Sequence, residues 1–189
     1  MRESVPFSVH ASRLVAAVRL AFAPAAVAWA LALPLATFAA SRPHASAAGA
    51  AFVVAVYSIG SLICHQLPAR SYHLWAMQMP VCARCTGIYF GAAVSVIVAA
   101  AFRHGARGLQ PSVHRSPERL ALRRLARQRL APRHPRVSLA LAVAPTLLTL
   151  LYEWTTGDMP SHAIRAAAGV PIGAVVAWLV VAAADNRVN

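Results

Sequence analysis

Long apolar runs separated by short polar breaks constrain the fold of this chain more than any other feature of its sequence. The runs cover residues 14–40, 47–63, 85–102, 137–152 and 162–184. About 20 apolar residues in an α-helix cross the hydrocarbon core of a bilayer, and these runs have roughly that length. We therefore predict an all-α, polytopic helical membrane protein with about five transmembrane helices.

The runs divide the chain into an N-terminal segment, a core and a short tail. Residues 1–46 hold the first span and the polar break after it, residues 47–184 hold four further spans, and residues 185–189 form the tail. A cleaved signal peptide is the alternative for the first run, which ends in the small residues Ala39-Ala40-Ser41. The run is longer than the apolar part of a typical signal peptide, so we expect a retained span.

Basic residues are concentrated in one loop. The chain is 59% hydrophobic and only 12% charged, where a soluble domain has about 25% charged residues. Its net charge is +13, and ten of its arginines lie in residues 103–136 against the single acid Glu118. The positive-inside rule predicts that this loop is cytoplasmic, where it would contact anionic lipids. Nucleic-acid binding is not expected, because the loop has no aromatic residues.

This orientation predicts the sides of the other loops in the cell's inner (cytoplasmic) membrane. The loop at residues 65–82 and the short turn after the fourth span would both be non-cytoplasmic. Counting five spans also predicts a non-cytoplasmic N-terminus and a cytoplasmic C-terminus. Residues suited to ligation or proton transfer then gather at one membrane face: Cys64, His65, Cys82, Cys85, Glu153, Asp158, His162 and Arg165. Ionisable groups near spans are costly, so this grouping indicates a functional site.

All three cysteines of the chain lie in this region. Cys82-Ala83-Arg84-Cys85 places two thiols one turn apart where a helix begins, a position that favours thiolate, and Arg84 adds a cation. With Cys64 and His65 these residues make a Cys3His set of the kind that binds zinc tetrahedrally. A variant of this set uses His162 and leaves His65 for a supporting role.

The same residues allow other functions. If a bound zinc activates water, Glu153 or His65 is the candidate general base. Alternatively, Cys82 and Cys85 form an exchangeable disulfide of a membrane redox protein, or a disulfide that only staples the loop. A further alternative is an accessory subunit of a larger membrane complex or a homo-oligomer. No nucleotide cofactor is expected.

Two features have packing roles as their simplest interpretation. Gly87 and Gly91 lie on one helix face, where small residues let another helix approach closely. Glu153 ends the fourth span and Arg165 lies in the opening turn of the fifth, on the same face as His162. An ion pair between Glu153 and Arg165 would anchor this hairpin.

Two motifs resemble those of a prokaryotic membrane-protein family, the domain of unknown function numbered 2085. The first comprises Cys64-His65-Gln66, Arg70-Ser71 and Pro80-Val81-Cys82-Ala83-Arg84-Cys85-Thr86-Gly87-Ile88-Tyr89 with Gly91. The second is similar to Glu153 followed by His162-Ala163-Ile164-Arg165-Ala166-Ala167-Ala168-Gly169, with His162 where the family pattern has asparagine. The resemblance covers roughly residues 47–184 and implies the fold and the location of the site. The family has no established activity, so it implies no reaction.

Overall fold

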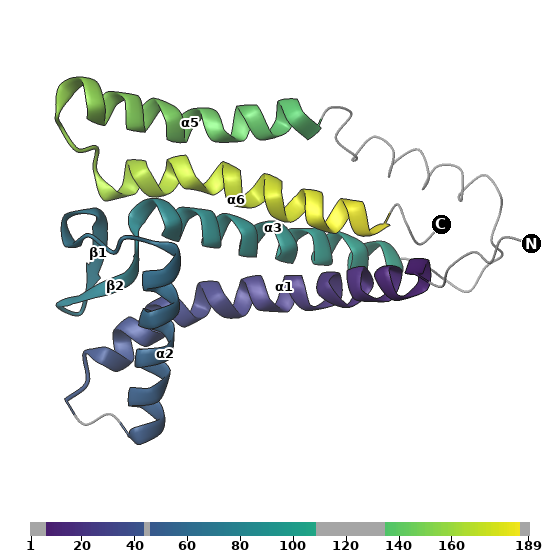
Figure 1. Cartoon of the computed structure of the whole chain (residues 1–189), viewed down its shortest axis with the longest axis horizontal. Helices are drawn as coiled ribbons and strands as arrows, with labels where there is room; N and C mark the ends of the chain where they lie inside the picture. The colour runs from purple at the N-terminus through teal and green to yellow at the C-terminus, as the bar shows by residue number, and fades with distance from the viewer. Residues whose placement is uncertain (1–6, 44–45, 109–134, 186–189) are drawn as a thin grey trace, which may run out of the picture.

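Five α-helices make up most of the computed structural model, which describes residues 7–43, 46–108 and 135–185. They are α1 (Phe7–Ala40), α2 (Ala47–Ile63), α3 (Ala83–Gly108), α5 (Pro135–Thr156) and α6 (His162–Asp185) (Figure 1). Each helix coincides with one of the predicted apolar runs, so the predicted helical membrane fold is confirmed. Residues 109–134, which make up most of the arginine-rich loop, lie outside the described residues.

Four of the five helices are long and apolar enough to cross a membrane. The candidate spans are Ala21–Ala40, Ala83–Ala101, Pro135–Thr156 and His162–Ala182. Helix α2 has only 17 residues, about 25 Å, which is shorter than a hydrocarbon core of about 30 Å. It also runs across the direction of the other four helices, at one end of the bundle (Figure 1). The described helices thus include four candidate spans, and the second predicted run is a crosswise helix.

The crosswise direction of α2 changes the expected position of the N-terminus. Figure 1 shows the first turns of α1 at the same end of the bundle as the last turns of α3 and α6. The five-span count placed the N-terminus on the side of the cysteine motif, whereas α1 begins at the opposite end of the bundle, because α2 does not return the chain across it. Arg13 and Arg19 consequently lie toward the end from which the arginine-rich loop departs.

Helices α3 and α6 form the most extensive contact in the structure. Gly87 and Gly91 of α3 and Gly169 and Gly173 of α6 all lie in this contact. A Cβ atom at any of these four positions would collide with a backbone carbonyl oxygen of the opposite helix. The predicted close approach at Gly87 and Gly91 is confirmed, and a reciprocal pair of glycines on α6 completes it.

A short β-hairpin occupies residues that we expected to form only a loop. After a 3-10 turn at Pro68–Arg70, strand β1 (Ser71–Leu74) pairs antiparallel with β2 (Met77–Cys82). The two turn residues, Trp75 and Ala76, have φ angles of 52° and 63°, as in a type I′ hairpin turn. The hairpin leads directly into α3, so it fixes the position of Cys82 beside the first turn of that helix.

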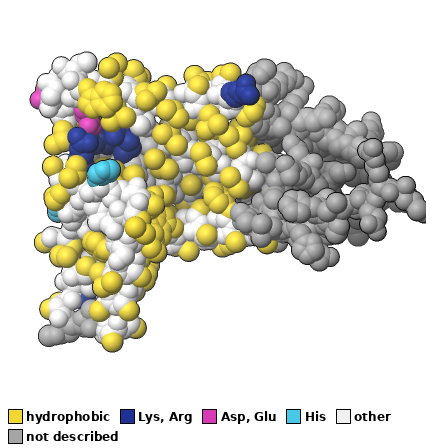
Figure 2. Space-filling view, in the orientation of Figure 1, with side chains coloured by type: hydrophobic (Ala, Val, Ile, Leu, Met, Phe, Trp, Pro, Cys, Tyr) yellow, Lys and Arg dark blue, Asp and Glu magenta, His cyan; other side chains and the backbone are white. Residues whose placement is uncertain are grey.

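The outer surface of the long helices is apolar. Figure 2 shows hydrophobic side chains along the length of the bundle, and large exposed ones include Leu35, Val94, Ile97, Leu141 and Leu148. The buried core that the hairpin shares with α1 and α2 contains Leu33, Val56, Met79 and Val81. An apolar exterior over helices of this length is typical of a protein that contacts lipid tails.

Candidate metal centre

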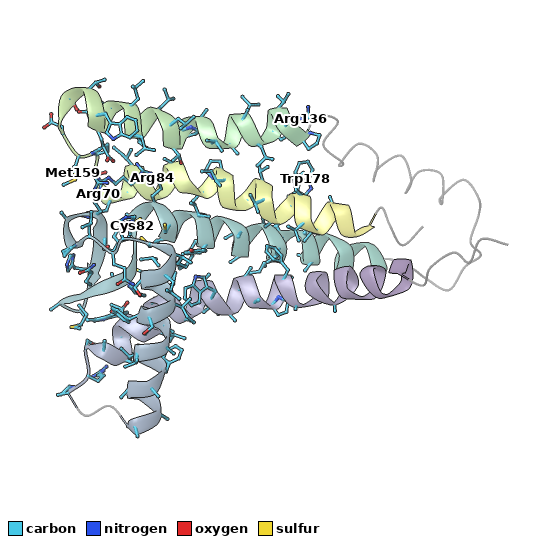
Figure 3. The ribbon with its side chains drawn as sticks, in the orientation of Figure 1. Arg70, Cys82, Arg84, Arg136, Met159 and Trp178 are labelled. Atoms are coloured by element: carbon cyan, nitrogen blue, oxygen red, sulfur yellow. The ribbon has the colours of Figure 1, made fainter. Side chains whose placement is uncertain are left out.

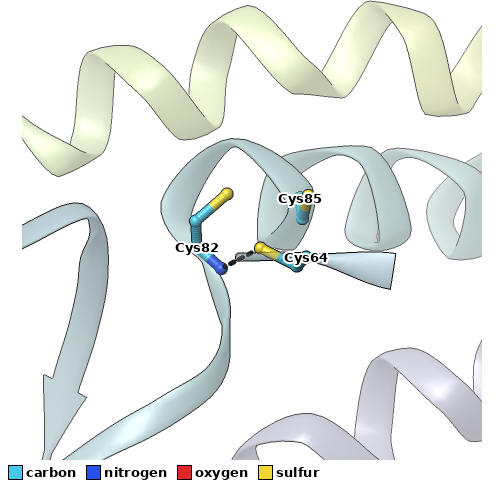
Figure 4. Close-up of side chains that lie close together, drawn as sticks. All are labelled: Cys64, Cys82 and Cys85. Atoms are coloured by element: carbon cyan, nitrogen blue, oxygen red, sulfur yellow. Dashed lines mark hydrogen bonds between the residues drawn. The ribbon is translucent and has the colours of Figure 1, made fainter. Parts of the chain in front are cut away.

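Three cysteine side chains converge at the end of the bundle that carries the hairpin. Cys64 directly follows α2, Cys82 ends β2, and Cys85 lies in the first turn of α3. One ligand atom from each, the Sγ atom, lies within 4.8 Å of the other two. Figure 4 shows the three side chains gathered beside the start of α3. Three separate elements thus supply one compact group of sulfur ligands.

Backbone geometry turns the Cys64 side chain into this group. Cys64 ends α2 with extended backbone angles, φ −148° and ψ 139°. Successive side chains of an extended segment point to opposite sides, so Cys64 is buried whereas His65 is exposed. The helix thus ends in a conformation that separates the side chains of these two neighbours.

A clamp of glutamine side chains holds the end of α2 against β2. The Gln66 side-chain amide donates hydrogen bonds to the carbonyl oxygens of Tyr57, at 3.0 Å, and Pro80, at 2.6 Å. The Gln78 amide donates in return to the Gln66 carbonyl oxygen at 2.5 Å. At Gly60 a side chain would collide with the Pro80 carbonyl oxygen. The clamp holds Cys64 beside Cys82. It was not predicted from the sequence, although Gln66 belongs to the motif Cys64-His65-Gln66.

Hydrogen bonds at the start of α3 favour the thiolate form of Cys82. The Cys82 N–H donates to the Cys64 Sγ atom at 3.2 Å, and the Thr86 hydroxyl donates to the Cys82 carbonyl oxygen at 3.1 Å. A hydrogen bond from the Cys85 thiol, assisted by backbone N–H groups of Arg84 and Cys85, outweighs burial and lowers the pKa of Cys82 to about 5. The lowered pKa favours the thiolate form of Cys82, which is the form that binds metal.

Neither of the predicted histidine ligands belongs to the three-sulfur group. His162, the first residue of α6, stacks its ring at a tilt on Tyr72 of β1, with 5.5 Å between the ring centroids. Its Nε2 atom is buried without a hydrogen-bond partner. The described structure thus brings the cysteines together and leaves both histidines outside that group.

A cluster of ion pairs lies at the same end of the bundle. Glu153, buried near the end of α5, accepts a hydrogen bond from the Arg165 Nε atom at 3.0 Å and from the Arg84 Nη2 atom at 3.2 Å. The Arg70 Nη2 atom lies 3.6 Å from the other carboxylate oxygen. The predicted pair between Glu153 and Arg165 is confirmed. Three arginines around this carboxylate favour a charge-balancing role for Glu153 over that of a general base.

Arg84 connects this cluster with the cysteines. It lies between Cys82 and Cys85 in the sequence, but its side chain reaches α5, where its Nη2 atom also donates to the Thr149 hydroxyl at 3.1 Å. Figure 3 shows Arg84 and Arg70 close together, with Cys82 on the neighbouring part of the chain. The segment from Cys82 to Cys85 thus places its two thiols beside Cys64 at the end of α2, and the Arg84 guanidinium beside α5.

Comparisons with known proteins agree with the predicted family. A family model described as "Predicted membrane protein (DUF2085)" matches residues 64–179, more than half of the chain. An uncharacterised protein of Methanocaldococcus jannaschii is 49% identical over 45 residues, which cover 24% of this chain and 29% of that protein. No solved structure matches the chain. The matched range contains both predicted motifs, and the chain belongs to the DUF2085 family of predicted membrane proteins.

Proposed function

We propose that this chain is a multi-pass membrane protein that binds one thiophilic metal ion, with zinc as the first candidate, through Cys64, Cys82 and Cys85. The observation that carries the proposal is the approach of three sulfur ligand atoms to within 4.8 Å of one another. Thiolates select zinc and other soft or borderline cations over magnesium and calcium. The lowered pKa of Cys82 supports ligation, since less free energy is needed to remove the proton that a metal ion would replace.

Three protein ligands leave one tetrahedral position of zinc for another group. Zinc sites that act on substrates keep such a position for water or substrate, whereas structural sites fill all four with protein ligands. The exposed side chain of His65 follows Cys64 directly, so a rotation of the backbone after Cys64 would be needed to bring it to the ion. We therefore propose a three-cysteine centre whose fourth ligand comes from outside the group, and assign His65 and His162 no place in it.

Metal analysis of cysteine variants tests this proposal. Protein purified without chelator is expected to carry about one zinc per chain, and Cys64→Ser, Cys82→Ser and Cys85→Ser are each expected to retain less than about a tenth of it. His65→Ala is the matched control, because it changes the residue next to Cys64 and should keep the metal. Metal-free protein with Cys82 joined to Cys85 or to a partner would support thiol–disulfide exchange and contradict the proposal.

We also propose that the cysteine centre lies on the non-cytoplasmic side of the cytoplasmic membrane. The support is the distribution of arginine: ten residues lie at 103–136, and Arg2, Arg13 and Arg19 lie toward the start of the chain. With four spans, both of these basic segments are on the same side, in agreement with the positive-inside rule. The five-span count had placed the two segments on opposite sides.

Reporter fusions test this orientation. Alkaline phosphatase fused after Met159, in the turn between α5 and α6, is expected to be active because it would be exported. Green fluorescent protein fused at the C-terminus, after Asn189, is expected to fluoresce because it would remain cytoplasmic. The reversed pattern, with an inactive phosphatase and a dark C-terminal fusion of normal abundance, would contradict the proposed orientation.

A further inference from the structure

The ion-pair cluster around Glu153 holds more positive than negative charge. Arg70, Arg84 and Arg165 all lie within 3.6 Å of the single Glu153 carboxylate. Within this cluster the carboxylate offsets one guanidinium and leaves two positive charges. Figure 2 shows arginine, acidic and histidine side chains in one patch at this end of the bundle. A buried charge without a counter-charge is costly, so the cluster is suited to receiving an anion.

The side chains of the cluster become less exposed from the surface inward. The Arg70 side chain is 44% exposed, the Arg84 side chain 17% and the Arg165 side chain only 3%. The Arg165 Nη2 atom and the Arg84 Nε atom are buried and have no hydrogen-bond partner, and the acceptor Glu153 Oε2 is buried without one too. Buried donors are rarely left unpaired, because each one forfeits its hydrogen bonds to water. The cluster therefore contains donors for a group that is not part of the chain.

We propose that Arg70, Arg84 and Arg165 bind a phosphate group, with Glu153 holding the guanidiniums in place. Two excess positive charges match the charge of a phosphate monoester near neutral pH, and guanidinium forks fit phosphate oxygens with paired hydrogen bonds. Arg165 binds Glu153 through Nε and Arg84 binds it through Nη2, so each guanidinium keeps one buried donor beside that contact unpaired, Nη2 in Arg165 and Nε in Arg84. Arg70 is the exposed member and lies where the ligand enters.

The surroundings of the cluster suit a phosphate at the depth of lipid headgroups. Tyr152 and Trp154 flank Glu153 on α5, and their side chains are 48% and 80% exposed. Exposed aromatic residues at the end of a spanning helix are typical of the boundary between hydrocarbon and water. A phosphate group reaches this position either as the headgroup of an anionic lipid or as a soluble phosphate from the aqueous side.

Thermal unfolding of the full chain in phosphate-free buffer distinguishes these sources. Inorganic phosphate is added in detergent, and reconstitution in phosphatidylcholine nanodiscs is compared with nanodiscs that contain phosphatidic acid. Saturable stabilisation by inorganic phosphate identifies a soluble ligand, and stabilisation by phosphatidic acid alone identifies a lipid headgroup. Either result supports the proposal. No stabilisation by either, or equal stabilisation by chloride at matched ionic strength, overturns it.

Variants localise the binding to the cluster. Arg70→Gln changes an exposed side chain and should leave the fold intact while weakening phosphate binding at least about tenfold. Arg42→Gln is the control, since Arg42 is an arginine near the same end of the bundle that stacks on Phe38 instead of contacting Glu153. Equal affinities in the two variants would assign the effect to general surface charge and overturn the proposal. The readout does not require bound zinc, so it is independent of the metal centre.

Discussion

Glu153→Leu is expected to destabilise the protein by about 3–5 kcal/mol, because it removes the carboxylate that balances the buried guanidinium of Arg165 and the largely buried one of Arg84. The effect should be large because the Arg165 side chain is only 3% exposed and is held by Glu153 at 3.0 Å. Removing one partner of a buried ion pair costs more than the pair itself contributes, since the remaining charge has lost its hydration as well. Thermal or denaturant unfolding in detergent and phosphate-free buffer measures the change.

Asp158→Leu is the matched control for this substitution. Asp158 is an acidic residue five positions farther along, and it is exposed in the turn between α5 and α6. Removing an exposed charge changes stability little. If Glu153→Leu were as stable as the original chain, or if both variants lost the same stability, the buried ion-pair cluster would not contribute as described.

Gly173→Leu is expected to separate α3 from α6. Most of the purified variant should therefore not be natively folded. A Cβ atom at Gly173 would collide with the Ile88 carbonyl oxygen. Overpacking commonly costs about 1–3 kcal/mol where side chains can move aside. Here the obstacle is backbone, so the helices themselves must move apart. Size-exclusion chromatography and thermal unfolding in detergent should show aggregated or strongly destabilised protein.

Ala167→Leu on the same helix provides the comparison. Ala167 is exposed, so a larger apolar side chain there would point toward lipid or detergent. The variant is expected to elute and unfold like the original chain. A monodisperse Gly173→Leu protein of unchanged stability would show that the close contact between α3 and α6 is not required.

The Gly173→Leu variant also bears on the arrangement of the two sites. The α3–α6 contact includes the backbone of Arg84, which faces Gly169, and Arg84 lies between two of the three cysteines. A shift of α6 would therefore move Arg165 relative to Arg84 and disturb the turn that carries Cys82 and Cys85. We expect Gly173→Leu to weaken both sites together, whereas Arg70→Gln affects only the phosphate site.

The helices could be predicted from the sequence because membrane insertion depends on local composition. Each of the five predicted apolar runs lies within one of the five helices, and the bounds of α2, Ala47–Ile63, are the predicted ones. The direction of α2 could not be predicted, since it depends on contacts that Gln66 and Gly60 make with β2. Two of these contacts involve the carbonyl oxygen of Pro80, which no hydropathy pattern identifies.

The candidate site was partly predictable, because some of its residues lie close together in the sequence or on either side of a short turn. Cysteine spacing identified Cys64, Cys82 and Cys85, and the short turn between the fourth and fifth spans related Arg165 to Glu153. The sequence did not indicate that Arg70 and Arg84 also reach Glu153, because these contacts join segments about 70 to 80 residues apart in the chain. The histidines were assigned to the metal set by residue type and by their predicted position at the same membrane face, whereas the backbone after Cys64 turns His65 outward.

X-ray absorption at the zinc edge tests the central claim most directly, because it measures the atoms bound to the metal in the intact protein. We predict three sulfur neighbours at about 2.3 Å and one lighter neighbour at about 2.0–2.1 Å. Cys64→Ser should reduce the number of sulfur neighbours or abolish zinc binding. A spectrum with only nitrogen and oxygen neighbours, together with a sulfur–sulfur bond of about 2.03 Å between two of the cysteines, would contradict the metal centre.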